Sequence, residues 1–154
     1  MSEKSWQPTL TEIALVFSRL ADRVAEREQI ILDPYVEQAL REALFHLELQ
    51  IPGWDPPFDA DAARAMAKAA RESLERGNER EALSRALRGL SFAPHDPALF
   101  YVAASATFEA GAVELALRML CHTLWIHPGH EAARADLEAL TAFFDDSEGQ
   151  QRAA

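Results

Sequence analysis

The chain has 154 residues, of which 49% are hydrophobic and 26% charged, and it carries a formal net charge of −10 at pH 7. This length and composition predict one globular domain, and the net charge argues against nucleic acid or an anionic membrane as a partner, because phosphates are bound by clustered Lys and Arg. The single cysteine, Cys121, excludes an internal disulfide, and no apolar run approaches the ~20 residues that cross a bilayer, so we expect a cytoplasmic protein.

The first predicted element is an amphipathic helix. Residues 1–8 are polar and are expected to be disordered. Thr9 and Glu12 have the spacing of a capping box, which satisfies backbone groups at the start of a helix. Apolar residues then recur at helical spacing, which predicts a helix from about Thr9 to Ile31.

A second helix is predicted directly after the first. Asp33 and Pro34 are typical of an N-cap and a first helical position, and they predict a helix over residues 35–50. The proline-rich stretch 52–57 then predicts a semi-rigid connection. Three arrangements stay open for this N-terminal unit, residues 9–58: a divergent hairpin stacked on the elements that follow, which we favour, a dimerisation element, or a lid over their groove.

Two segments of 34 residues, 63–96 and 97–130, repeat one pattern. Their identities fall where a helical hairpin needs them: glycine in the turn, a small residue early in the second helix, and proline at the end. The identical pairs are Ala69/Ala103, Ala70/Ala104, Glu75/Glu109, Gly77/Gly111, Ala82/Ala116, Leu83/Leu117, Leu90/Leu124 and Pro94/Pro128. Each segment is therefore predicted to form two antiparallel helices.

This pattern resembles the tetratricopeptide repeat (TPR), which has a large aromatic residue at position four, small residues at eight and twenty, and proline at thirty-two. The residues at these positions are Met66, Ala70, Ala82 and Pro94 in the first unit and Phe100, Ala104, Ala116 and Pro128 in the second. Ser73 and Thr107 depart from the family's tyrosine, and Ala86 and Leu120 from its second aromatic. The resemblance implies an all-α fold in which antiparallel helical hairpins stack as a short right-handed superhelix; the N-terminal helical pair, which does not match the repeat pattern, is expected in addition.

The C-terminal part of the chain is predicted to close this stack. Residues 131–144 continue an apolar helical pattern after the second unit, and we expect them to form a capping helix. Residues 145–154 offer no apolar anchor and are expected to be a disordered tail.

The resemblance also implies a groove, lined by the first helix of each hairpin, that binds a partner protein. The partner-contacting positions of the family, carried onto this chain, are Arg64, Ala67, Lys68, Arg71, Leu74, Tyr101, Val102, Ser105, Phe108, Ala135 and Ala139. Arg64, Lys68 and Arg71 would form a basic strip, and Tyr101 and Phe108 an apolar floor. Such a groove suits an extended or helical segment with apolar anchors and some acidic groups.

Plainer explanations of the same residues stay open. The basic strip could be a solvated helix face that pairs with Glu72 and Glu75, which contributes only tenths of a kcal/mol per pair. Tyr101 and Phe108 could simply pack against neighbouring helices.

Cys121, His122, His127 and His130 invite a search for a metal site. Zinc needs about four ligands that converge. Cys121 and His122 are neighbours on a predicted helix and point ~100° apart, so both cannot easily join the two histidines of the following loop. We therefore expect neither a metal nor another cofactor.

We expect an adaptor or chaperone-like module that binds a segment of another protein, and not an enzyme. The alternative is a self-associating scaffold subunit, a homodimer formed through its N-terminal helices. A metal-binding or enzymatic protein that uses Cys121, His127 and His130 is the least favoured hypothesis. Size, acidity and repeat content are also similar to those of the bacterial type III secretion chaperones of the translocator class, a resemblance of architecture alone.

Overall fold

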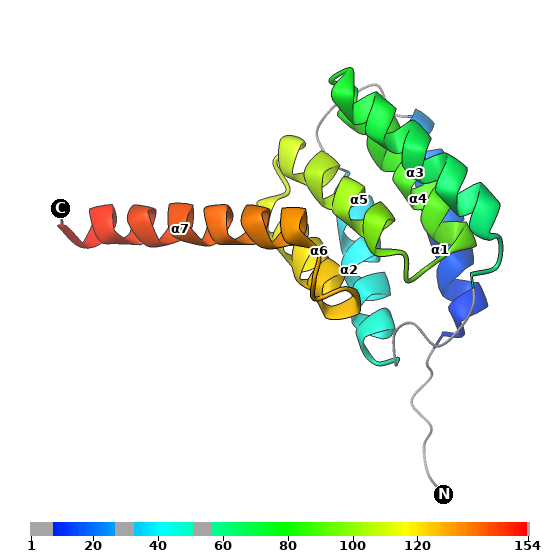
Figure 1. The fold of residues 1–154 in the computed structure, drawn as a ribbon, viewed down its shortest axis with the longest axis horizontal. Helices are drawn as coiled ribbons and strands as arrows, with labels where there is room; N and C mark the ends of the chain where they lie inside the picture. The colour runs from blue at the N-terminus through cyan, green and yellow to red at the C-terminus, as the bar shows by residue number, and fades with distance from the viewer. Residues whose placement is uncertain (1–7, 27–32, 51–56, 154) are drawn as a thin grey trace, which may run out of the picture.

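The computed structural model describes residues 8–26, 33–50 and 57–153, with side chains as far as Phe143. These residues form seven α-helices, and no strand occurs among them, which confirms the all-α prediction (Figure 1). Within the same residues, no helix has both the length and the apolar character that a membrane span requires.

Helices α1 (Leu10–Glu26) and α2 (Pro34–Glu48) begin where the sequence predicts. Thr9 and Glu12 form the predicted capping box: the Glu12 N–H donates to Thr9 Oγ1 at 3.2 Å, and the Thr9 N–H donates to Glu12 Oε1 at 3.4 Å. Asp33 caps α2, because its carboxylate accepts a hydrogen bond from a first-turn N–H at 3.0 Å.

Three predictions about the N-terminal third lie wholly or largely outside the described residues. They are the disorder of residues 1–8, the extension of the first helix to Ile31, and the semi-rigid connection over residues 52–57.

The two repeat segments form two helical hairpins, as predicted. The first consists of α3 (Ala60–Glu75) and α4 (Glu79–Phe92), and the second of α5 (Pro97–Glu109) and α6 (Val113–Ile126). Within each hairpin the two helices pack along each other, and α4 also packs against α5. The hairpins are therefore joined into one row of helices.

Glycine makes the turn inside each hairpin. Gly77 has a φ of 76° and Gly111 a φ of 88°, a left-handed conformation that other residues rarely adopt. The N–H of the residue after each glycine reaches back to the last turn of the helix, from Asn78 to the Ser73 carbonyl at 2.9 Å and from Ala112 to Thr107 at 3.0 Å. These turns confirm the role predicted for the two glycines.

Helix α7 (Glu131–Ala153) follows the second hairpin and packs on α6. The predicted end near residue 144, with a disordered tail beyond it, is wrong: the helix continues through residues 145–153 and projects away from the other helices (Figure 1). The sequence has no proline after residue 144, and Glu148, Gln150, Gln151, Arg152 and Ala153 are good helix formers, so the weaker Ser147 and Gly149 do not end the helix.

The N-terminal helices lie behind the hairpins. Helix α1 packs along α4, and α2 packs against α6, whereas α3, α5 and α7 lie in front in Figure 1. The rings of Phe17 in α1 and Phe100 in α5 meet edge to face at 6.2 Å. The N-terminal pair thus packs on the repeat segments, with each of its helices against the second helix of one hairpin. It does not lie as a lid over α3 and α5.

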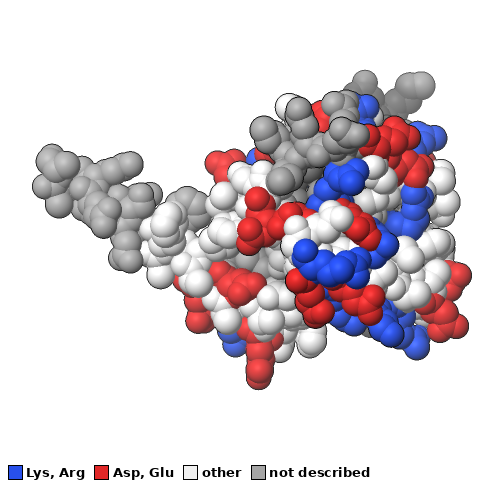
Figure 2. Space-filling view, turned by 90° about the horizontal axis from the view of Figure 1, so that it is seen from above, with Lys and Arg blue, Asp and Glu red and all other residues white. Residues whose placement is uncertain are grey.

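Polar contacts join the N-terminal helices to the hairpins. Ser84 of α4 donates to the Ala21 carbonyl of α1 at 2.8 Å, and Arg118 of α6 pairs with Glu48 of α2 at 3.2 Å. Figure 2 shows Lys and Arg intermixed with Asp and Glu over the face seen from above. The excess of acidic residues is therefore not gathered into one patch on that face.

Candidate partner-binding site

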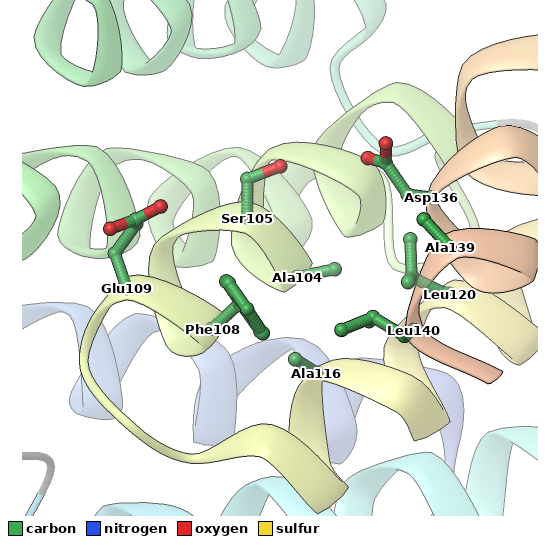
Figure 3. A pocket seen from close by; sticks show the side chains of 9 residues that line it. All are labelled: Ala104, Ser105, Phe108, Glu109, Ala116, Leu120, Asp136, Ala139 and Leu140. Atoms are coloured by element: carbon green, nitrogen blue, oxygen red, sulfur yellow. The ribbon is translucent and has the colours of Figure 1, made fainter. Parts of the chain in front are cut away.

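A pocket of about 320 Å³ opens between α5, α6 and α7. In Figure 3, Phe108 of α5 and Leu140 of α7 point toward each other across it. The pocket is lined by the apolar residues Ala104, Phe108, Ala116, Leu120, Ala139 and Leu140 and by the polar residues Ser105, Glu109 and Asp136. It thus has an apolar interior and a polar rim.

Residue size explains why space remains here. Ala104 of α5 and Ala116 of α6 are each 1% exposed, and their small side chains let the two helices approach each other beneath the pocket. Leu120 follows one turn later on α6, at the position where the TPR pattern has an aromatic residue. Leucine fills less volume than an aromatic ring, so the space between α6 and α7 stays open.

Tyr101 joins α5 to α7 beside the pocket. Its hydroxyl donates a hydrogen bond to Asp136 Oδ2 at 2.7 Å, and its ring centroid lies 4.9 Å from that of His130. Burial, and then the Asp136 carboxylate, raises the pKa of Tyr101 to about 12. The hydroxyl therefore keeps its proton at neutral pH and holds the start of α7 beside α5.

Four of the predicted groove residues come together at this site. Ser105, Phe108 and Ala139 line the pocket, and Tyr101 borders it through its bond to Asp136. The Phe108 side chain is 40% exposed, so part of its ring is accessible to another molecule.

Two predicted groove residues are buried instead, Ala67 at 4% exposure and Val102 at 2%. Ala67 shares its helix face with Ala63 and Ala70, and this face is the buried side of α3, which packs against α4. Val102 belongs to the buried set of α5, a helix that contacts both α4 and α6. Neither side chain can contact a partner, because helix packing uses these positions.

The other predicted residues lie apart from the pocket. Arg64, Lys68 and Arg71 are exposed along α3, and Arg64 lies 3.5 Å from Asp61, an exposed pair of little energetic weight. Leu74 is half-buried against the core, and Ala135 is exposed on α7. The basic strip thus exists as a surface feature of α3, but it does not line the pocket.

The charge around the pocket is negative. Glu109 and Asp136 are the charged groups of its lining, and both are exposed. An apolar side chain could be buried between Phe108, Leu120 and Leu140. A cationic group beside that side chain could pair with the rim carboxylates.

The prediction omitted the contribution of the second helix. Leu120 and Ala116 come from α6, whereas the family pattern assigns the partner surface to first helices only. Leu140, from the predicted capping helix, packs against the core and forms part of the pocket wall as well. The replacement of an aromatic residue by Leu120 was the signal in the sequence that could have indicated the space.

The histidines and Cys121 lie in different environments. His130 caps α7, since its Nδ1 accepts the Ala133 N–H at 3.1 Å. His122 is 2% exposed, while Cys121 and His127 are on the surface. Among the described residues, no three His, Cys, Asp or Glu side chains gather as metal ligands.

No model of a known protein family matches this chain, and no curated protein matches it. Its chemistry must therefore be derived from the pocket itself. The pocket offers apolar surface, two carboxylates and the Ser105 hydroxyl, which already donates to the Tyr101 carbonyl at 3.2 Å. These groups can bind and orient a side chain.

Proposed function

We propose that this protein is an interaction module, an adaptor or chaperone-like protein, that holds a segment of another protein across α5 and α7. The observation that carries the proposal is the open apolar pocket between α5, α6 and α7. Its volume of about 320 Å³ is at the lower end of the ~300–1,000 Å³ range of ligand pockets. The resemblance of residues 63–130 to TPR units supports the same role.

The partner segment in this proposal carries an apolar anchor. The anchor enters the pocket and packs on Phe108, because an accessible aromatic ring in a concave site is the usual center of an interaction surface. Acidic groups of the segment would lie over Arg64, Lys68 and Arg71 of α3, and a basic group next to the anchor would meet Glu109 and Asp136. A cytoplasmic location belongs to the same proposal and is supported by the exposed thiol of Cys121.

The test is affinity capture from an extract of the source cells, with the wild type compared with Phe108→Glu. A carboxylate in place of the ring would have to be desolvated against apolar side chains, which costs several kcal/mol when no partner group compensates it. We expect capture of the partner to fall at least ~10-fold, the change that 1.4 kcal/mol produces.

Phe58→Glu is the matched control, because Phe58 is also an exposed aromatic residue, at 52%, and does not line the pocket. It should capture the partner as the wild type does. Far-UV circular dichroism confirms that both variants stay helical. Full retention of every partner by a helical Phe108→Glu variant would refute the pocket as the binding site.

A further inference from the structure

The outward faces of α1 and α2 carry large apolar side chains that the core does not bury. Leu15 is 53% exposed on α1, and Tyr35 and Phe45 are 61% and 51% exposed on α2. Between the two helices lies a groove of about 370 Å³, whose lining includes Leu15 and Val16 of α1 and Ala39 and Ala43 of α2. An apolar groove of this kind between two helices is typical of a contact surface for further helices.

Charged residues frame the apolar part of this groove on α1. Four residues of α1 line the groove: Glu12, Leu15, Val16 and Arg19. Their spacings of three, one and three residues place them on one face of the helix. They therefore form a single stripe with an acid at one end, two apolar residues in the middle and a base at the other end.

This stripe is complementary to itself in the antiparallel direction. If a second α1 lies antiparallel across the first, with the two-fold axis between Leu15 and Val16, then Leu15 faces the partner's Val16. Glu12 then faces the partner's Arg19, and the symmetry repeats this pair on the other side of the axis. A parallel alignment would instead bring like charges together, which destabilises the contact.

The two charges do not form a pair within one chain. Seven residues separate Glu12 from Arg19, about 10 Å along the helix axis. The next charged residues of α1 already have partners inside the molecule, since Asp22 pairs with Arg88 of α4 and Arg23 lies 2.7 Å from Asp33. Arg19 is exposed and lines the groove together with Glu42 of α2.

We propose that the α1–α2 groove binds a second copy of this chain, with α1 antiparallel to the partner's α1. In such a dimer, Leu15 and Val16 form the center, and α2 of each copy flanks it with Tyr35. The groove is lined by residues of α1 and α2 and the segment before α1, and the pocket by residues of α5, α6 and α7, so the two sites share no residue. The inference stands independently of the proposed partner.

The first test is light scattering on the full chain over a range of protein concentrations, which should give twice the chain mass. E12R and R19E each place like charges together at two symmetric positions, so we expect each to weaken dimerisation at least ~10-fold. E12R also removes the carboxylate that accepts from Thr9 in the capping box, so far-UV circular dichroism checks that E12R and the double variant keep α1. The double variant E12R/R19E restores both pairs with reversed sign and should restore the dimer. The proposal would be overturned if the chain were a monomer at every concentration. It would also be overturned if neither single variant weakened the dimer, or if the double variant did not restore it.

A second test does not depend on charge or on the stability of the α1 cap. Leu15→Cys in a Cys121→Ser background places two thiols next to the proposed axis, and mild oxidation should link two chains by a disulfide. Ala65→Cys in the same background is the control, since Ala65 is exposed on α3, away from the groove. Equal cross-linking of the two variants, or none with Leu15→Cys, would overturn the proposal.

Discussion

His122 lies in the interior, although histidine ordinarily titrates near neutral pH. It is 2% exposed, and its ring centroid lies 4.5 Å from that of Phe100, 5.6 Å from Trp125 and 6.4 Å from His95. Within the described part of the chain, neither of its ring nitrogens has a hydrogen-bond partner. Burial, and then the charges of His95 and Arg118, lowers the pKa of His122 to about 4. The ring is therefore neutral at pH 7.

We expect this histidine to make the protein less stable in mild acid. In the unfolded chain its pKa is ~6.5, whereas in the folded protein it is about 4. As the pH falls between these values, the unfolded state binds a proton that the folded state does not. The free energy of unfolding is thus fully retained above pH ~6.5 and decreases toward pH ~4, by ~3 kcal/mol at most. Urea unfolding at several pH values measures the decrease.

The His122→Leu variant isolates this contribution from that of the carboxylates, which is common to both proteins. Because leucine has no titrating group, the variant should lose ~3 kcal/mol less than the wild type over the same pH range. His127→Leu, which replaces an exposed histidine, should behave as the wild type. Equal pH dependence of His122→Leu and the wild type would contradict the prediction.

The roles of residues that act only on their sequence neighbours could be predicted from the sequence, whereas the burial of His122 could not. The cap that Thr9 and Glu12 form on α1 and the turn at Gly77 were predictable, because each involves only residues a few positions apart in the sequence. The burial of His122 depends on Phe100 of α5 and on the turn that carries His95, which only the packed structure brings together.

At the scale of helices, Gly89 sets how closely α4 approaches its neighbours. It lies inside α4, where glycine is ~1 kcal/mol less favourable than alanine. A Cβ atom built there would lie 2.5 Å from Leu99 Cδ2 of α5 and 3.1 Å from Met66 Cβ of α3. The glycine thus permits contacts with both helices that any side chain would obstruct.

We expect Gly89→Ala to destabilise the protein despite its better helix propensity. Leu99 is fully buried, so its methyl groups have little room to move away, and overpacking of a core costs ~1–3 kcal/mol. This exceeds the ~1 kcal/mol gained in propensity, and thermal unfolding should show a lower midpoint. Gly129→Ala is the control, because a Cβ there would meet only the His127 ring, at 3.6 Å. A midpoint at or above that of the wild type would show that α3 and α5 adjust freely.

Helices α3 to α6 were predictable because glycine, asparagine or aspartate, and proline bound them in the sequence. The extent of α7 was not, since Asp145, Asp146 and Gly149 are residues of the same kinds, yet the helix continues past them to Ala153. The pocket was half predictable: the repeat pattern indicated Ser105, Phe108 and Ala139, but the space beside them arises from Leu120 and from the way α7 leaves α6.

For the whole molecule, the N-terminal layer, helices α1 and α2, determines whether the repeat segments can fold independently. Two stacked hairpins with a capping helix would be a small repeat array, in which each unit needs only its sequence neighbours. Here α1 instead packs along α4, and α2 against α6. Four large apolar residues of α1 are buried, namely Ile13, Phe17, Leu20 and Val24. The second helices of the hairpins are thus buried on the side away from α3 and α5.

We therefore expect the fragment of residues 57–154 not to fold cooperatively. At ~1.5–3 kcal/mol for each large apolar side chain, the four residues of α1 contribute ~6–12 kcal/mol, comparable with the ~5–15 kcal/mol by which a whole domain is stable. Deletion also recovers the entropy of ordering α1, but it exposes the apolar residues of α4 that α1 covers. Circular dichroism during heating should show a broad, shallow transition for this fragment.

A fragment of residues 1–143 removes length from the other end, where α7 projects from the body, and should keep the midpoint of the full chain. A sharp transition of the 57–154 fragment near that midpoint would show that the hairpins and α7 are stable without the N-terminal layer.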